Sequence, residues 1–156
     1  MESLVWAASL FAIVGAGVVT GLLFAFSNFV MTALAELPDE VGMFAMQRIN
    51  VHIINPVFLA FFLGTPIACA AVMAGWYAGA EVPRATLVGV GLYACGPFGI
   101  TMACNVPWNN RLASVDPAGS AAIWPVYQRR WQRWNHLRTY VGILAIASMA
   151  YGAVGP

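Results

Sequence analysis

The chain has 156 residues, of which 61% are hydrophobic and 8% are charged, and its mean hydropathy is +0.76. This length and composition predict a single domain, residues 1–156, that lies almost wholly within a membrane and leaves no room for a separate soluble catalytic domain. The formal net charge of +1 provides no basic surface of the kind that nucleic-acid binding requires, so no nucleic-acid partner is expected.

Charged side chains are absent from four long stretches of the chain. These stretches are residues 3–35, 49–80, 85–110 and 139–156. Each is close to or above the ~20 residues that a helix needs to cross ~30 Å of hydrocarbon. Only a helix or a closed barrel satisfies its backbone polar groups inside a bilayer, so the pattern predicts four membrane-spanning helices with the lipid bilayer as their main surroundings.

The first span is expected over residues 4–33. Gly17 and Gly21 lie four residues apart within it, and this spacing of small residues lets another helix approach closely, which leaves a homo-oligomer open. Pro38 breaks the helix, and a second helix is expected to begin at Asp39, whose carboxylate is a favourable N-cap.

The second span is expected to follow an interfacial helix. Residues 41–55 mix polar and apolar side chains, and Arg48, His52 and Asn55 share one face if the helix is continuous. Pro56 then bends or starts a helix at the beginning of a strongly apolar run.

The third span is expected over residues 86–104. Gly96 and Pro97 predict a bend within it, because proline removes a backbone donor from a helix. A loop is expected at residues 113–119.

The last helix is expected to start near Ser120 and to run from a polar half, residues 127–138, into the fourth span, residues 139–154. The sequence therefore predicts an all-α fold, namely an integral membrane four-helix up-down bundle with interfacial helical extensions before spans 2 and 4.

The arginines predict the orientation of this bundle. Four spans place both termini on one side with Arg84, and place the remaining arginines on the other side, namely Arg48, Arg111, Arg129, Arg130, Arg133 and Arg138. The positive-inside rule then assigns the polar side to the cytoplasm and both termini to the non-cytoplasmic side.

Polar side chains gather at the predicted cytoplasmic end, where they can satisfy one another or line a pocket. Arg138 begins an otherwise apolar span, where an ionisable group needs a partner or an anionic ligand. The candidate site residues come from three segments and are Asn50, His52 and Asn55, then Asn105 and Asn109, and finally Trp131, Trp134, Asn135 and Arg138.

Metal and nucleophile chemistry have little support in the sequence. His52 and His136 are the two imidazoles of the chain, and they form no H-x-x-x-H or H-x-x-E spacing. No G-x-S-x-G sequence, phosphate loop or dinucleotide fingerprint is present. No metal site is therefore expected.

Three sequence motifs carry a family resemblance. They are Met46-Gln-Arg-Ile-Asn with Asn55-Pro, Asn105-Val-Pro-Trp-Asn-Asn-Arg-Leu, and Trp131-Gln-Arg-Trp-Asn-His-Leu-Arg-Thr. With them the chain resembles, over nearly its whole length, the anthrone oxygenase-like family of small integral membrane proteins. Most members of that family have no characterised function, and some members from polyketide pathways oxidise an anthrone to an anthraquinone with molecular oxygen.

The resemblance implies a membrane-embedded, cofactor-independent oxygenase that acts on a flat lipophilic phenol, anthrone or quinone. In that interpretation His52 is the base, because an imidazole exchanges protons near neutral pH, and Arg138 with Asn109 or Asn135 stabilises an enolate. The two indoles, Trp131 and Trp134, would stack on the polycycle. The remaining substrate-binding candidates are Asn50, Asn55 and Asn105.

Two other classes stay open, so the sequence leaves undecided whether the protein is an enzyme. In one, the protein is a non-enzymatic membrane binding or partner protein, and its polar cluster only holds the helices together. In the other, His52 or His136 binds haem or a metal. The first expectation, however, is that the protein binds no cofactor.

Overall fold

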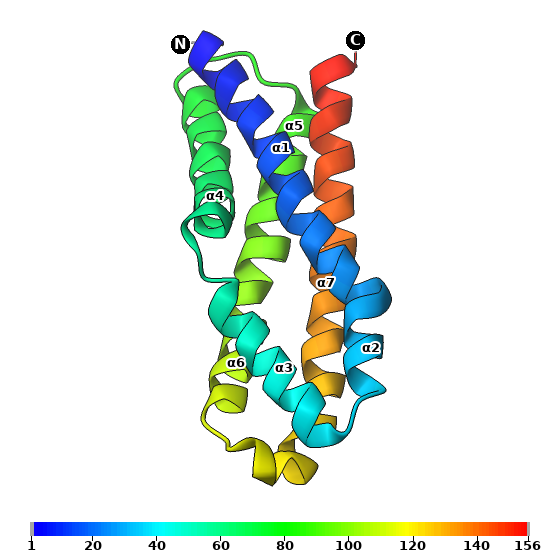
Figure 1. Ribbon diagram of the computed structural model, residues 1–156. Coiled ribbons are helices and arrows are strands. Elements are labelled where there is room, and N and C mark those ends of the chain that lie inside the picture. Colours follow the sequence, from blue (N-terminus) through cyan, green and yellow to red (C-terminus); the bar gives the residue numbers. More distant parts are fainter. Residues whose placement is uncertain (1, 156) are drawn as a thin grey trace.

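The computed structural model describes residues 2–155, except for the side chains of Pro117, Ser120 and Ala121. The chain forms a bundle in which the N and C ends lie at the same end (Figure 1). We call this the terminal end and the opposite one the polar end. Four helices are long and apolar enough to cross a membrane, which confirms the predicted all-α membrane bundle, and they comprise Glu2–Ala35, Pro56–Tyr77, Arg84–Ala113 and Ala122–Val154.

Two of the four long helices are each built from an α-helix, a π-helical segment and a second α-helix. The first consists of α1 (Glu2–Ala25), η1 (Phe26–Val30) and α2 (Met31–Ala35). The third consists of α5 (Arg84–Tyr93), η2 (Ala94–Asn105) and α6 (Val106–Ala113). The bend that Gly96 and Pro97 predicted is therefore a twelve-residue π-helix, and the helix continues into α6 rather than ending near Cys104.

The other helices confirm both helical extensions. The helix α3 (Asp39–His52) precedes α4 (Pro56–Tyr77), and a short 3₁₀ turn, η3 (Pro117–Gly119), precedes α7 (Ser120–Val154), which carries the polar half and the fourth span without interruption. Because α4 has 22 residues, it is about 33 Å long and crosses the hydrocarbon without its neighbour. The hydrocarbon can therefore be crossed without α3, and the interfacial position of α3 stays a prediction.

Two local predictions about the start and end of α3 were wrong. Asp39 is the first residue of the helix rather than its N-cap, because Pro38 occupies the capping position and no side chain caps the helix. Asn55 lies beyond the end of α3, so it does not share a face with Arg48 and His52. Its side chain instead caps α4, where Asn55 Oδ1 accepts a 3.0 Å hydrogen bond from the Phe58 N–H.

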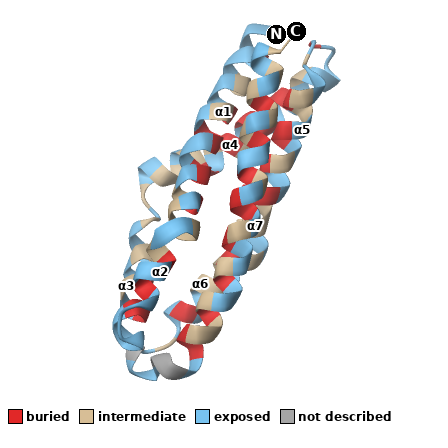
Figure 2. Ribbon diagram, turned by 90° about the vertical axis from the view of Figure 1, so that its right-hand side faces the viewer, coloured by how far each residue is buried: buried red, intermediate tan, exposed pale blue. Residues whose placement is uncertain are grey.

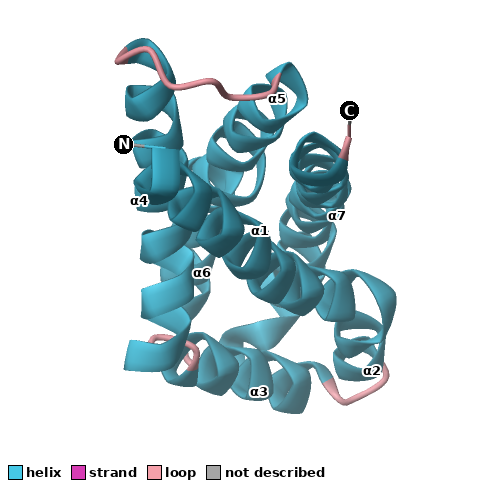
Figure 3. Cartoon of the chain, turned by 90° about the horizontal axis from the view of Figure 1, so that it is seen from above, coloured by secondary structure: helices cyan, strands magenta, loops and turns pink. Residues whose placement is uncertain are grey.

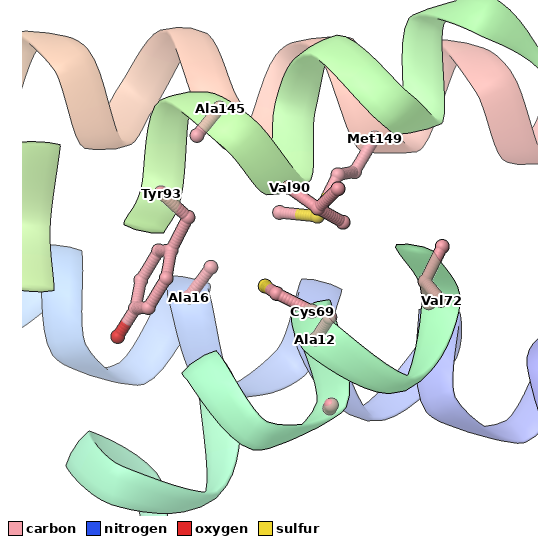
Figure 4. Close-up of a cluster of buried hydrophobic side chains, with 9 residues drawn as sticks. Ala12, Ala16, Cys69, Val72, Val90, Tyr93, Ala145 and Met149 are labelled. Carbon is pink, nitrogen blue, oxygen red and sulfur yellow. The ribbon is translucent and has the colours of Figure 1, made fainter. Parts of the chain in front are cut away.

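One hydrophobic core lies in the half of the bundle nearer the terminal end, and a second core, which includes Met43, Leu112 and Trp124, lies toward the polar end. Figure 4 shows small and medium side chains from four helices converging in the first core, namely Ala12 and Ala16 of α1, Cys69 and Val72 of α4, Val90 and Tyr93 of α5, and Ala145 and Met149 of α7. Figure 2 shows that buried and exposed residues alternate along each long helix, so each helix has a buried side and an exposed side. Seen from above, α1 crosses the bundle obliquely (Figure 3), and it packs against both α4 and α7.

The contact between α5 and α7 depends on a glycine. A Cβ added at Gly89 would lie 2.8 Å from the Ala145 carbonyl oxygen and 2.8 Å from the Met149 nitrogen, both backbone atoms that a rotamer change cannot move. On the same helix, a Cβ at Gly91 would meet nothing within 4 Å. Gly89 and Gly91 therefore provide a test position and a control position on the same helix.

We predict that Gly89→Ala destabilises the protein by about 1–3 kcal/mol, because the added methyl group overpacks the α5–α7 contact. Gly91→Ala is the control and should be neutral or stabilising, since alanine favours a helix over glycine. Thermal unfolding of both purified variants in detergent measures the difference. Equal melting temperatures would contradict this account of the packing.

Candidate functional site

A buried guanidinium lies at the centre of the polar network in α7. Arg138 is only 5% exposed. Its Nε and Nη2 both donate to Asn135 Oδ1, at 3.1 and 2.7 Å, and its Nη1 donates to Thr101 Oγ1 at 2.8 Å. Its carbon Cζ lies 5.1 Å from the centre of the Trp131 ring, a cation–π contact. A guanidinium has five N–H groups, so two of them lie outside these three hydrogen bonds.

Asn135 uses both ends of its amide in this network. Its Oδ1 accepts the two bonds from Arg138, and its Nδ2 donates to the Leu23 carbonyl at 2.9 Å and to Ser27 Oγ at 2.7 Å. The side chain is fully buried. Asn135 therefore joins α7 to the first long helix while it holds Arg138 in place.

Each hydroxyl group can donate only one proton, and this fixes which atom is the donor in the remaining hydrogen bonds. Thr139 Oγ1 donates its one proton to the Asn135 carbonyl at 2.7 Å, so in its 3.1 Å contact with Ser27 Oγ the serine is the donor. Thr101 Oγ1 donates to the Pro97 carbonyl and can therefore accept the bond from Arg138. Each hydroxyl thus has one consistent donor direction.

Both π-helical segments lie beside this network. Ser27 belongs to η1, and Thr101 belongs to η2, which Asn105 ends. A π-helix bonds residue i to residue i+5 and changes the register of the side chains that follow, and such segments occur often at functional sites. Here the two segments bring polar side chains of the first and third long helices onto the polar face of α7.

A second group of polar contacts lies further toward the polar end. Asn105 Nδ2 donates to the Trp131 carbonyl at 3.1 Å, and Tyr127 OH donates to Asn109 Oδ1 at 2.9 Å. Gln47 of α3 donates from Nε2 to two carbonyl oxygens, that of Leu112 in the last turn of α6 and that of Val115 just beyond the helix, each at 2.9 Å. These bonds join α3, α6 and α7 at this end of the bundle.

An aromatic stack runs along the buried face of α7. Trp124 stacks on Tyr127 with ring centres 5.7 Å apart, and Tyr127 stacks on Trp131 at 6.1 Å. Phe26 of η1 meets Trp131 edge-on at 5.4 Å. Four buried polar atoms in this region have no hydrogen-bond partner in the structure, and they are Asn50 Nδ2, Asn105 Oδ1, Trp124 Nε1 and Trp131 Nε1.

The charge of Arg138 is not balanced by a buried carboxylate. The chain contains six acidic residues, and all six are exposed, namely Glu2, Glu36, Asp39, Glu40, Glu81 and Asp116. The three hydrogen bonds of Arg138 end on neutral oxygens. A desolvated cation with only neutral partners is a favourable place for an anionic guest.

The structure brings some of the predicted site residues together. Trp131, Asn135 and Arg138 share the buried face of α7, and Asn105 bonds to the backbone of that helix. Asn109 bonds instead to Tyr127, two turns before Asn135 and about 12 Å along the helix axis.

Other predicted residues lie outside the network. His52 is exposed, and its Nε2 lies 3.0 Å from Nη2 of Arg48 on the same helix. Trp134 is 38% exposed. Asn55 caps α4, and Asn50 is half-buried with no hydrogen-bond partner for its Nδ2. His136 is half-buried, and its ring stacks on Tyr140 at 6.5 Å.

The sequence analysis missed three hydroxyl side chains, one on each of the first, third and fourth long helices. Ser27, Thr101 and Thr139 complete the network, and none of them was a candidate. The available signal was weak, because single hydroxyl groups in apolar spans usually bond to their own backbone. Asn28, next to Ser27, could have marked this turn as polar, although Asn28 itself is exposed.

Two hollows lie away from Arg138. One of about 560 Å³ lies at the terminal end, between α1, α5 and α7. The other, of about 670 Å³, lies among Arg129, Arg130 and Arg133 on the outer face of α7. Within residues 2–155, no group of three or more His, Cys, Asp or Glu side chains is arranged to hold a metal ion.

The fold and the network define a small helical membrane protein with four spans and a buried cationic polar site. The chain belongs to the anthrone oxygenase family, which it matches over residues 57–148, more than half of its length. The matched region contains Thr101, Asn105, Asn135 and Arg138, whereas Ser27 and His52 precede it. Comparisons with curated proteins and with solved structures each found no significant match.

We predict that Asn135→Leu destabilises the protein by about 3 kcal/mol, because it leaves two N–H groups of Arg138 and the Leu23 carbonyl without partners in a buried site. Asn110→Leu is the control, since Asn110 is exposed. Thermal unfolding in detergent compares both variants with the wild type. If Asn135→Leu melted at the wild-type temperature, the network would not hold the bundle together.

Proposed function

We propose that the protein is a membrane-embedded, cofactor-independent oxygenase that acts on a flat, lipophilic hydroxylated anthrone or a related phenol or quinone. Membership of the anthrone oxygenase family supports this reaction class. The observation that carries the proposal is Arg138, a guanidinium that is 5% exposed and bonded only to neutral oxygens. An enolate or phenolate would supply the negative charge that the site lacks.

The depth of Arg138 suits a lipophilic guest. It lies 16 residues before Val154, so it is about 24 Å along α7 from the terminal end of the helix and within the ~30 Å of hydrocarbon. A flat polycycle dissolved in the bilayer can reach this depth laterally, without crossing water. Burial also strengthens the attraction between a cation and an enolate oxygen.

The reaction balances without a metal or an organic cofactor. An anthrone loses a proton from its benzylic CH₂ group, and the resulting enolate transfers electrons to O₂ and forms a carbon–oxygen bond. The hydroperoxide at that carbon then eliminates water to leave a second ketone. One anthrone and one O₂ therefore give one anthraquinone and one water. The protein must lower the energy of the enolate and accept the first proton.

In this proposal Arg138 stabilises the enolate through the two N–H groups that its hydrogen bonds to Asn135 and Thr101 leave over. Asn135 and Thr101 are positioning residues, because they hold the guanidinium rather than touch the substrate. The ring of Trp131 contacts the guanidinium of Arg138 and the rings of Phe26 and Tyr127. Trp131 therefore holds Arg138 in place, and its ring is not an open surface for stacking on a substrate.

Proton removal is assigned to His52, the imidazole at the end of α3. Its side chain is exposed and bonds to Arg48 rather than to the network around Arg138. A substrate would therefore have to meet His52 where α3 joins α4, at the membrane surface on the side of the bundle's polar end. The positive-inside rule puts this end in the cytoplasm, and that orientation is part of the proposal.

A structural role for the polar cluster is the second candidate, and one observation favours it. Asn135 satisfies all of its side-chain hydrogen bonds within the protein, so the network holds the helices together without a guest. In that case the protein is a membrane binding or partner protein, and Arg138 affects stability and nothing else.

We predict that the purified wild-type protein in nanodiscs oxidises 1,8-dihydroxyanthrone under O₂, and that Arg138→Gln lowers kcat/KM by about 10²–10³-fold. Oxygen consumption and the absorbance of the quinone measure the rate. Arg138→Lys keeps the charge and should retain an intermediate rate.

Arg133→Gln is the control, because Arg133 is an exposed arginine on the same helix. Melting temperatures of all variants separate lost catalysis from lost folding. A wild-type protein without turnover, combined with an Arg138→Gln variant that only melts earlier, would support the structural candidate instead.

We predict that His52→Ala lowers kcat by about 100-fold, the size of effect expected for a general base. Oxygen consumption with 1,8-dihydroxyanthrone measures the rate. Arg48→Gln, which removes the neighbour of His52 but not the imidazole, is the matched control. Unchanged rates in His52→Ala would show that the proton goes to solvent, and they would leave the role of Arg138 intact.

A further inference from the structure

The hollow at the terminal end is separate from the site around Arg138. It has a volume of about 560 Å³, and its walls come from α1, from the turn at residues 80–83, from the start of α5 and from the end of α7. In Figure 1 the first turns of α1 lean away from the last turns of α7, and residues of both helices line the hollow. Pockets of this volume commonly hold small lipophilic ligands.

The walls of the hollow are apolar and partly small. Ile13 and Met149 contribute apolar surface at its deeper end, while Ser9 and Gly152 take up little room. Gly152 lies directly against Thr86, because a Cβ at Gly152 would clash with the threonine hydroxyl. Trp6 is 68% exposed on the lipid-facing rim. The hollow therefore has mostly apolar walls and opens sideways toward the lipid, and we call it the slot.

The depth of this slot matches one leaflet of the bilayer. Its lining along α1 runs from Glu2 to Ile13, a rise of about 16 Å, and half of the ~30 Å hydrocarbon is about 15 Å. Because α4 ends at Tyr77, just before the lining turn at residues 80–83, the mouth lies at the level of the head groups. A molecule standing in the outer half of the bilayer would fill the slot lengthwise.

The mouth of the slot carries negative charge. Glu2 on α1 and Glu81 in the turn both line it, and both are exposed. They come from separate parts of the chain, the start of α1 and the turn before α5. Arg84 follows the lining residue Pro83 in the sequence and is exposed at the start of α5. This arrangement complements a head group with an outer ammonium and an adjacent phosphate.

We propose that this slot binds a phospholipid with a primary-amine head group, phosphatidylethanolamine, independently of any oxygenase activity. One acyl chain lies between α1 and α7, against Ile13 and Met149. The ammonium group donates hydrogen bonds to Glu2 and Glu81, and the phosphate pairs with Arg84. The lipid fills the space that the diverging helices leave open.

Native mass spectrometry of the full-length protein in detergent tests the head-group preference. The protein is titrated with dioleoyl lipids that differ only in head group, namely phosphatidylethanolamine, phosphatidylcholine and phosphatidylglycerol. We expect phosphatidylethanolamine to bind about fivefold or more tightly than phosphatidylglycerol. Phosphatidylcholine should lie between them, because its ammonium is cationic but has no N–H group. Equal affinities for the three lipids would overturn the proposal.

Matched variants test the two parts of the slot. The double variant Glu2→Gln and Glu81→Gln should lose the preference for the amine, whereas Glu36→Gln, an exposed carboxylate outside this lining, should keep it. Ala153→Phe should reduce binding of all three lipids by filling the slot, whereas the exposed Ala147→Phe should not. Wild-type lipid binding in Ala153→Phe, at an unchanged melting temperature, would place the lipid elsewhere.

Discussion

The burial of one unbalanced positive charge shapes the polar half of this bundle. Removing a guanidinium from water costs several kcal/mol, and Arg138 recovers part of this energy through three hydrogen bonds and an indole ring. To provide those bonds, Asn135 and Thr101 must be aimed at it, and Asn135 must in turn be held by Leu23 and Ser27. The relative positions of three long helices follow from this requirement.

The π-helical segments explain how three apolar helices can supply these polar partners. A regular α-helix through an apolar span would place a hydroxyl according to its own backbone register. The segments η1 and η2 change that register where the helices pass α7, so Ser27 and Thr101 reach the network. The middle and the terminal end of the bundle then differ in kind, since the middle contains a buried cation and the terminal end an apolar hollow lined at its mouth by carboxylates.

The gross fold could be predicted from the sequence because it depends on charge and length. The four charge-free stretches became four long helices, and both polar extensions are present. Arg138 was recognisable because an arginine at the start of an apolar span must be accommodated. Gly96 and Pro97 marked the place of η2 as a bend but not its π-helical form, and nothing in the sequence marked η1.

The site could be predicted only in part, and helix geometry explains why. At about 100° per residue, Asn135 and Arg138 lie within 40° of Trp131 around the axis, whereas Trp134 lies about 60° to one side and is exposed. The predicted face of α7 is thus the buried one for Trp131, Asn135 and Arg138, but it is narrower than predicted because it does not include Trp134. His52 was chosen for its chemistry, but α3 presents it outward. Ser27 was missed because nothing in the first span identifies which hydroxyl faces inward.

The long π-helix η2 also makes the length of the third helix critical. Each residue advances an α-helix by about 100°, so deleting one residue between Ala94 and Asn105 would rotate every later side chain by about that angle. Asn105, Asn109 and Leu112 would then swing away from α7 and α3 together. Related sequences that align without gaps through this stretch should share the polar network, and those that have lost a residue there should have rebuilt it from other positions.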